Sequence, residues 1–329
     1  MKKIFSIPVV LFSLMLPVSG QTPEFHGKPI AEIFTDFHVN ISDTTEKTGF
    51  ALNRAYLGYQ FLPEGSISGK IIINIGTPED LAAGSEPRRY AYCREASLTW
   101  SRNNLSVTMG ITGTRIFQYQ QNFWGKRYLA KPYQAMNGYG TVADLGIAAD
   151  YYLNDMLKFD MTIMNGEGYS NIQLDNNFRT SLGLTITPGN KIAVRLYGDI
   201  QKAERVRQTV LIGFAGFKND ILTIGGEVSY KSNIDMIQGH HAWGLSATGS
   251  INLTKKTELF SRFDYISSAV MKNDILKWNY KTDGTFFIGG IQFKLNEYVK
   301  AAIDYQGRFP YSPGGQISDL IYLNLLFKL

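Results

Sequence analysis

Apolar and polar side chains alternate along most of this chain. In the last stretch, 316–329, Leu323 belongs to an apolar set of every second residue, and Asn324 belongs to the polar set between. The same alternation recurs in 139–153 and 297–308. A period of two residues is that of a β-strand, whose successive side chains point to opposite faces. The pattern therefore predicts a chain built almost entirely of strands.

Sixteen strands are predicted once the turn residues between the alternating segments are included. The expected ranges are 29–41, 48–62, 66–76, 90–103, 104–112, 139–153, 156–165, 177–188, 191–203, 206–217, 219–231, 240–253, 256–268, 280–293, 297–308 and 316–329. The connections differ in length in a regular way. Every second one is a tight turn rich in Gly, Asn, Asp or Pro, and the others are mostly longer.

An even number of antiparallel strands, with tight turns at one end and long loops at the other, is the layout of an outer-membrane barrel. A soluble β-sandwich also alternates, but it has short turns at both ends. Closure of the barrel pairs every backbone group, which lipid requires. We therefore expect an all-β fold, a transmembrane antiparallel up-and-down β-barrel that occupies 21–329 as one domain.

The first twenty residues indicate export. Lys2 and Lys3 precede an apolar run over 4–17, and small residues follow up to Gly20. This is the pattern of a signal peptide, residues 1–20, cleaved after Gly20. The apolar run is shorter than the ~20 residues of a spanning helix. We expect the mature chain to be an integral barrel in the outer membrane of a Gram-negative bacterium.

Composition narrows the function. The formal net charge of +5 is too mild for a nucleic-acid binder, and the lone Cys93 has no partner for an internal disulfide. Aromatic residues make up 13% of the chain, which suits the two aromatic girdles of a membrane barrel as well as ordinary strand propensity.

One long connection, 115–136, carries four basic side chains and no acid. A loop of this length is functional or disordered, and its six aromatic residues favour burial over disorder. We expect this third loop to fold into the lumen and narrow it. The constriction then carries Arg115, Lys126, Arg127 and Lys131, and clusters of Arg and Lys favour anions in pores.

Two alternatives for this loop stay open. It can pack outside the barrel, against lipopolysaccharide phosphates or a neighbouring protomer. It can also present Phe117, Tyr119, Trp124 and Tyr128 as a stacking track for sugar rings, which is typical of a saccharide-preferring porin.

The predicted wall of the lumen is close to neutral. Its basic residues are Arg54, Lys70, Lys158, Arg179, Arg195, Arg262 and Lys300, and its acidic residues are Glu95, Asp144, Asp150, Asp160, Asp199, Glu227, Glu258, Asp264 and Asp304. Seven bases against nine acids make no anion funnel, and we expect most of them to pair across neighbouring strands. Selectivity must then come from the third loop. Arg94 breaks the alternation, so it lies at the outer rim or a bulge turns it inward.

Catalytic and metal motifs are lacking. The sequence holds four His residues and no HExxH, GxSxG, glycine-rich phosphate loop or cysteine cluster. His240 and His241 adjoin in a loop, where a solvated turn is favoured over a metal site. We expect no enzyme activity, no catalytic residue, no metal and no cofactor.

Several segments carry a family resemblance: GFALNRAYLGYQF at 49–61, YCREASLTWSRNNLSVTMGI at 92–111 and MNGEGYSN at 164–171. With these segments the chain resembles the phosphate-selective porin O and P family, in the divergent form of exported Bacteroidetes porins. The resemblance implies a 16-stranded outer-membrane porin, usually trimeric, whose third loop lies in the lumen and whose basic residues select anions.

By position, the resemblance assigns Lys126, Arg127 and Lys131 as anion contacts of the loop and Arg54 and Arg195 as wall residues. The sequence departs from the phosphate-specific members because it lacks a rich row of lumen arginines and has more acids on the wall. The sequence therefore predicts a passive diffusion channel for small hydrophilic solutes. We expect it to have a modest preference for anions, either phosphate or anions in general. The expected partners are those solutes, outer-membrane lipid, lipopolysaccharide and two further copies of the chain. A non-conducting barrel that serves as an adhesin or scaffold is the other alternative.

Overall fold

The computed structural model describes residues 26–42, 48–62, 65–76, 89–173, 175–269, 278–279, 282–311, 315 and 317–329. The predicted signal peptide, 1–20, lies outside these residues.

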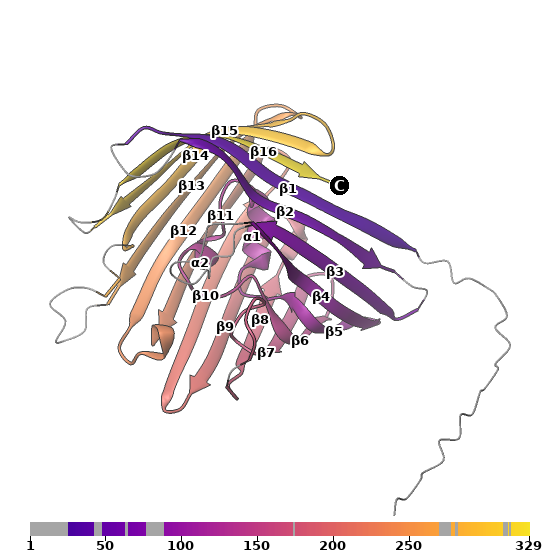
Figure 1. Cartoon of the computed structure of the whole chain (residues 1–329). Coiled ribbons are helices and arrows are strands. Elements are labelled where there is room, and N and C mark those ends of the chain that lie inside the picture. Colours follow the sequence, from indigo (N-terminus) through magenta and orange to yellow (C-terminus); the bar gives the residue numbers. More distant parts are fainter. Residues whose placement is uncertain are drawn as a thin grey trace, which may run out of the picture.

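Sixteen antiparallel strands form a closed barrel (Figure 1). Each strand pairs with its neighbours in sequence, and β1 closes the ring by pairing with β16. The strands are β1 (Gly27–Asn40), β2 (Gly49–Phe61), β3 (Ile67–Gly76), β4 (Tyr90–Arg102), β5 (Leu105–Gly113), β6 (Ala143–Tyr152), β7 (Leu157–Met164), β8 (Arg179–Ile186), β9 (Ile192–Ala203), β10 (Val206–Lys218), β11 (Leu222–Ser232), β12 (His241–Asn252), β13 (Thr257–Ser268), β14 (Gly284–Lys294), β15 (Val299–Pro310) and β16 (Ser318–Lys328). The predicted count and the up-and-down order are confirmed.

Helical segments are few and short in the part of the chain that the structure describes. The connection between β5 and β6 contains α1 (Gln118–Trp124) and α2 (Tyr133–Met136), and Figure 1 shows both in the space that the strands enclose. Two single 3₁₀ turns, η1 (Pro188–Asn190) and η2 (Ile234–Met236), lie in other connections. Within the described residues, no helix has the length and apolar character needed to cross a membrane.

Two predicted boundaries differ most, by four residues each: the fourteenth strand, expected at 280, begins at Gly284, and the start of the sixth strand is expected at 139. The sixth strand begins at Ala143, because Tyr139 belongs to the preceding loop and is buried inside the barrel. The Arg179 guanidinium donates a hydrogen bond of 2.8 Å to the Tyr139 carbonyl, so this backbone group bonds to a side chain instead of a neighbouring strand.

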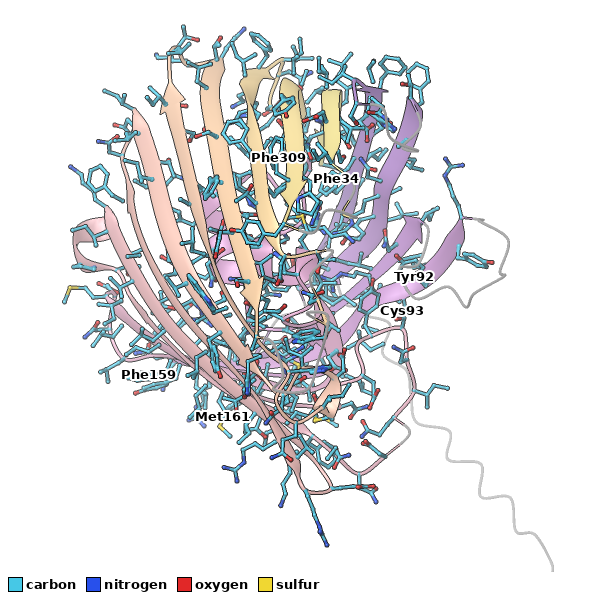
Figure 2. All side chains as sticks on the ribbon, turned by 90° about the vertical axis from the view of Figure 1, so that its left-hand side faces the viewer. Phe34, Tyr92, Cys93, Phe159, Met161 and Phe309 are labelled. Carbon is cyan, nitrogen blue, oxygen red and sulfur yellow. The ribbon has the colours of Figure 1, made fainter. Side chains whose placement is uncertain are left out.

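The two faces of the wall differ in polarity. Outward positions are apolar and exposed, as at Leu182 (63% exposed) and Leu196 (55%). Phe159 and Met161 also point away from the wall (Figure 2). The inward face carries buried polar side chains such as Ser229. Apolar outside and polar inside is the reverse of a soluble sandwich, so the alternation predicted the barrel correctly.

A bulge in β4 settles the position of Arg94. Ile72 of β3 lies opposite Glu95, and Ile73 lies opposite Cys93, so Arg94 is the extra residue of the bulge. Arg94 therefore turns inward, and its guanidinium carbon lies 5.5 Å from the centre of the Tyr169 ring. Of the two alternatives for Arg94, the inward bulge is confirmed.

Close strand packing in β5 gives the first testable prediction. Gly110 has a φ of +121°, and a Cβ atom placed there would lie 2.3 Å from the Ala96 carbonyl oxygen. We expect Gly110→Ala to lower the free energy of unfolding by about 1–3 kcal/mol, the cost of a strained backbone conformation. Denaturant titration of the refolded barrel measures this loss. Gly226→Ala is the matched control, since nothing lies within 4 Å of its Cβ position. Equal losses in both variants would contradict the packing described.

Candidate functional site: the constriction beside the third loop

The third loop, residues 114–142, is anchored inside the barrel by apolar contacts. Its first and last parts bury Ile116, Phe117, Tyr133 and Tyr139 in one cluster with inward-facing residues of the wall. The wall residues of this cluster are Tyr197, Val210, Ile212, Ala242 and Ile266. These come from β9, β10, β12 and β13, so the loop reaches across the lumen from its own strands. The predicted inward fold of the loop is confirmed.

The middle of the loop packs against a different part of the wall. Trp124, Tyr128 and Leu129 form a second cluster with inward-facing residues of the strands around the point of closure. These wall residues are Phe34, Phe260, Ile288, Ala302 and Leu326. The apolar wall residues of the two clusters interrupt a mostly polar lining, and the loop supplies the surface that buries them.

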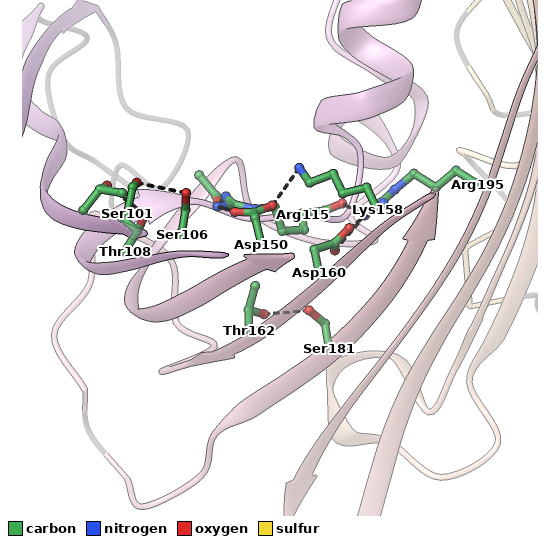
Figure 3. A network of polar contacts seen from close by, with 12 residues as sticks. Ser101, Ser106, Thr108, Arg115, Asp150, Lys158, Asp160, Thr162, Ser181 and Arg195 are labelled. Atoms are coloured by element: carbon green, nitrogen blue, oxygen red, sulfur yellow. Dashed lines mark hydrogen bonds and ion pairs between the residues drawn. The ribbon is translucent and has the colours of Figure 1, made fainter. Parts of the chain in front are cut away.

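Wall cations hold the start of the loop by its backbone. The Arg195 guanidinium donates 2.6 Å and 3.0 Å hydrogen bonds to the Asp160 carboxylate and one of 2.7 Å to the Arg115 carbonyl. Figure 3 shows this group beside a second ion pair, in which Asp150 accepts from Arg115 at 2.6 Å and from Lys158 at 2.7 Å. Because a buried carbonyl needs a donor, these bonds fix where the loop enters the lumen.

Arg262 holds the middle of the loop in the same way. Its guanidinium donates a 2.8 Å hydrogen bond to Asp264 and one of 2.6 Å to the Lys131 carbonyl. The guanidinium carbon also lies 5.1 Å from the centre of the Trp124 ring, within the range of a cation–π contact. One buried cation thus joins the strand β13 to two separate points of the loop.

The end of the loop is held by two further cations. Arg179 pairs with Asp199 at 2.6 Å while it donates to the Tyr139 carbonyl, and the Lys231 ammonium donates a 2.7 Å hydrogen bond to the Gly138 carbonyl. Arg195 and Arg262, predicted as lumen-wall residues, are buried on the inner side of the wall and bind the backbone of the loop.

Lys126 also faces the wall. Its ammonium group lies 2.6 Å from the Glu258 carboxylate, which in turn accepts a 2.7 Å hydrogen bond from Gln292. The Tyr128 hydroxyl completes the network by donating to Gln292 at 2.8 Å. Burial lowers the pKa of Lys126, and the Glu258 carboxylate opposes this shift. Burial raises the pKa of the Tyr128 hydroxyl, so this group acts as a neutral donor.

Two of the four loop residues predicted to contact anions are paired with the wall instead. Arg115 and Lys126 each form an ion pair with a wall carboxylate, Asp150 and Glu258, so their charges are compensated within the protein. The sequence could not reveal this, because Lys126 and Glu258 are 132 positions apart along the chain.

Arg127 and Lys131 face the open part of the lumen together with Arg54. Three cavities, of about 400, 570 and 790 Å³, are each lined by Arg54 and Arg127, and Lys131 lines the two larger ones. Arg54 lies 4.9 Å from the centre of the Tyr56 ring and makes no ion pair with a residue that the structure describes. These three cavities lie beside the third loop, and we refer to them together as the passage.

Basic residues outnumber acids along this passage. The 400 Å³ cavity is lined by five bases and two acids: Arg54, Arg94, Arg127, Lys300 and Lys328 against Glu32 and Glu297. The 790 Å³ cavity has four bases and one acid: Arg54, Arg89, Arg127 and Lys131 against Asp36. In low-dielectric surroundings, such an excess of positive charge gives a positive field.

A cavity of about 380 Å³ elsewhere along the loop shows the contrast. Lys70, Arg115, Lys158 and Arg195 line it together with Glu95, Asp150 and Asp160. Lys70 pairs with Glu95 at 3.1 Å, and the other bases belong to the pairs already described. Lys70 therefore lies in a balanced part of the lumen, where the bases are paired with acids.

Each of the nine acids expected on the wall has a partner. Glu95 pairs with Lys70, Asp150 with Arg115 and Lys158, Asp160 with Arg195, Asp199 with Arg179, Asp264 with Arg262 and Glu258 with Lys126, while Glu227 accepts from Gln134, Asp304 from Gln306 and Asn324, and Asp144 from the backbone amides of Leu145 and Gly166. The acids therefore stabilise the wall and the loops and leave the passage basic.

The predicted stacking track is not supported by burial. Phe117 is 1% exposed, Trp124 7% and Tyr128 3%, so these rings are packed within the protein and leave too little open surface for a sugar ring to stack on. Tyr119 is half-buried, with its ring 5.9 Å from that of Phe214, and lines only the balanced cavity. This corrects the assignment of these residues as solute contacts.

The sequence did not predict Arg89 and Tyr169 as lining residues, and it left open whether Arg94 faces outward or inward. Arg94 had a readable sign, because it breaks the alternation of β4. Tyr169 lies in the MNGEGYSN segment, and its ring stacks on Tyr92 at 5.9 Å as well as on Arg94. The connection between β7 and β8 therefore forms part of the passage wall.

The remaining histidines show no metal site. The His240 ring stacks on Trp278, with ring centres 4.4 Å apart. Among the residues that the structure describes, no group of three or more His, Cys, Asp and Glu side chains is placed to hold a metal ion.

Comparison with known proteins places this geometry in a known architecture. No protein-family model matches the sequence, and no curated protein matches it. Solved structures do match. OmpF of Salmonella typhi in complex with daunomycin gives a TM-score of 0.70 at 10% identity, over 93% of this chain and 98% of that one. A mutant of the Rh. blastica porin gives 0.57 at 11% identity, over 92% and 100%.

The chain has a porin-like fold. A third match, a loop-deletion mutant of OmpT, an outer membrane protein of Vibrio cholerae, gives a TM-score of 0.63 at 12% identity over 92% of this chain and 99% of that one. At such identities the likeness concerns the fold alone. The resemblance to the phosphate-selective porin O and P family is therefore carried by the sequence segments and not by a family match.

The anchoring of this porin-like barrel's third loop gives the second prediction. We expect Arg262→Gln to speed amide hydrogen exchange across 126–132 by at least tenfold, since a hydrogen bond from a charged group contributes roughly 1.5–3 kcal/mol. Hydrogen exchange with mass spectrometry measures this change.

The matched control is Lys158→Gln, because Lys158 is a lumen cation whose partner Asp150 keeps Arg115. This control should leave the loop's exchange unchanged. Unaltered exchange in Arg262→Gln, or equal acceleration in both variants, would show that Arg262 does not hold the loop.

Proposed function

We propose that this protein is an outer-membrane porin, a passive diffusion channel for small hydrophilic solutes with a modest preference for anions. The observation that carries the proposal is the excess of basic over acidic residues in the cavities beside the third loop. Arg54 and Arg127 are the residues we assign to the selectivity of the passage, with Arg94 and Lys131 beside them.

The wall supports the proposed membrane location. Its outward side chains are apolar and exposed, and closure leaves no unpaired strand edge. Exposed Leu residues are costly in water, whereas in lipid they are the favoured surface. Trp100, Tyr230 and Trp243 face outward as well, as interfacial aromatic residues do.

The mechanism is electrostatic and steric. The third loop narrows the bore, so a passing ion comes within the ~8 Å screening length of the basic residues at physiological salt. Anions are then attracted and cations repelled, while the wide cavities let both keep much of their hydration. No covalent step and no cofactor enters this mechanism, and we propose that the protein is not an enzyme.

Several lumen guanidinium groups already bind protein groups, and this favours a general anion preference over specific binding of phosphate. Arginine forks bind phosphate or carboxylate oxygens well when they are available. Arg179, Arg195 and Arg262 already bind a wall carboxylate and a loop carbonyl. The row of available arginines that specific phosphate binding needs is thus short.

The third prediction tests the channel directly. In planar bilayers under a KCl gradient, we expect the protein to conduct and to favour chloride. Arg54→Gln combined with Arg127→Gln should lower the chloride-to-potassium permeability ratio by about two- to fivefold, since a unit charge near contact is worth roughly 1 kcal/mol in water.

The control is Lys255→Gln combined with Lys256→Gln, which removes the same charge from the exposed turn between β12 and β13. Its permeability ratio should equal that of the unaltered protein. A folded barrel without conductance would support the scaffold alternative, and an unchanged ratio in the Arg54 and Arg127 variant would refute the assigned selectivity residues.

A further inference from the structure

Two cations face each other on the outside of the barrel. Lys202 of β9 lies directly opposite Arg207 of β10. Their neighbours Gln201 and Gln208 line a lumen cavity, so the alternation of the strands places Lys202 and Arg207 on the outer face, where both are exposed. Like charges directly opposite each other in a sheet are destabilising. Such a pair is stabilised when an anion lies between the two side chains.

Nothing in the described protein supplies that anion. Neither Lys202 nor Arg207 makes an ion pair with a residue that the structure describes. The hairpin tip between them adds Glu204 and Arg205, both exposed, whose charges offset each other. The tip over 202–207 keeps a net charge of +2.

An apolar hollow of about 800 Å³ lies on the same outer face. Its lining includes Leu182, Leu196, Leu211 and Val228, together with Phe159 and Met161, which Figure 2 shows pointing away from the barrel. The hollow exists because two outward positions, Gly198 and Gly213, have no side chain. A Cβ atom at Gly213 would meet only Leu196, at 4.0 Å.

The hollow and the cation pair lie along the same two strands. Gly198 precedes Lys202 by four residues in β9, which corresponds to about 13 Å of strand. The outward residues between them are Ile200 and Thr209, which pair with each other. The cation pair lies at the end of the barrel that carries the long loops, and the hollow lies deeper in the apolar band. An apolar surface below a cationic rim matches the two parts of a phosphorylated lipid.

We propose that this face binds a lipid of the surrounding membrane, with its phosphate between Lys202 and Arg207 and one acyl chain in the hollow over Gly198 and Gly213. The charge of the pair selects an anionic headgroup, and the apolar lining of the hollow selects a chain rather than a free ion. This site rests on the membrane location proposed above, but it is independent of ion conduction.

Native mass spectrometry of the detergent-solubilised protein tests the site with three probes. Dioleoyl phosphatidic acid has both parts, dioleoylglycerol lacks the phosphate, and inorganic phosphate lacks the chains. We expect the first to bind and the other two to bind at least about tenfold more weakly, since anionic headgroups are attracted by each basic residue near a membrane surface and chains by apolar burial.

Two variants separate the two parts of the site. Lys202→Gln combined with Arg207→Gln should weaken dioleoyl phosphatidic acid binding at least tenfold, by removing the attraction to the phosphate. Gly213→Leu fills the hollow from a position with space for a side chain, and it should weaken binding of the same lipid severalfold. Lys255→Gln combined with Lys256→Gln, at exposed positions of the opposite end, should leave binding unchanged.

Two further measurements on the same variants distinguish the lipid site from the channel. All three variants should keep the heat-dependent gel mobility of a folded barrel and the chloride preference of the unaltered protein. Equal binding of dioleoylglycerol, undiminished binding by the Lys202 and Arg207 variant, or occupation of the face by a second copy of the chain would overturn the lipid site while leaving the proposed channel intact.

Discussion

Hydrogen bonds from buried wall cations to backbone carbonyls of the third loop are the interaction on which the lumen depends. Arg195, Arg262, Arg179 and Lys231 each donate to one carbonyl of the loop, and the first three also bind a wall carboxylate. A charge taken out of water is costly unless it is paired and hydrogen-bonded, so the three arginines require both the acid and the loop. The loop in turn needs donors for its buried carbonyls.

This arrangement divides the basic residues of the lumen into two groups. Arg195, Arg262 and Arg179 carry no uncompensated charge into the passage, because a carboxylate lies beside each of them. Arg54 and Arg94 lie instead against aromatic rings, with no ion pair among the described residues. An aromatic face orients a guanidinium without neutralising it. The passage is therefore basic even though the predicted wall set holds nine acids and only seven bases.

Much of the fold could be predicted from the sequence, because strand alternation and turn residues are local signals. These signals predicted the sixteen strands, their closed order and the inward fold of the third loop. The aromatic residues of that loop need a surface to bury them. The bulge at Arg94 was visible as a break in the alternation, but the sequence did not show whether the side chain points outward or inward. The roles of individual cations could not be predicted. Arg127 faces the cavities and Lys126, its neighbour, pairs with Glu258, and that choice depends on which distant strand each side chain meets.

Zero-length crosslinking with a water-soluble carbodiimide tests the central claim most directly, because it joins an amine to a carboxylate only where the two are in contact. In the folded protein, the account predicts a peptide in which Lys126 is bonded to Glu258, whose groups lie 2.6 Å apart. The wall pair Lys328 and Glu32, at 3.1 Å, serves as the positive control. A crosslink between Lys328 and Glu32 without one between Lys126 and Glu258 would show that the third loop does not lie against the wall as described.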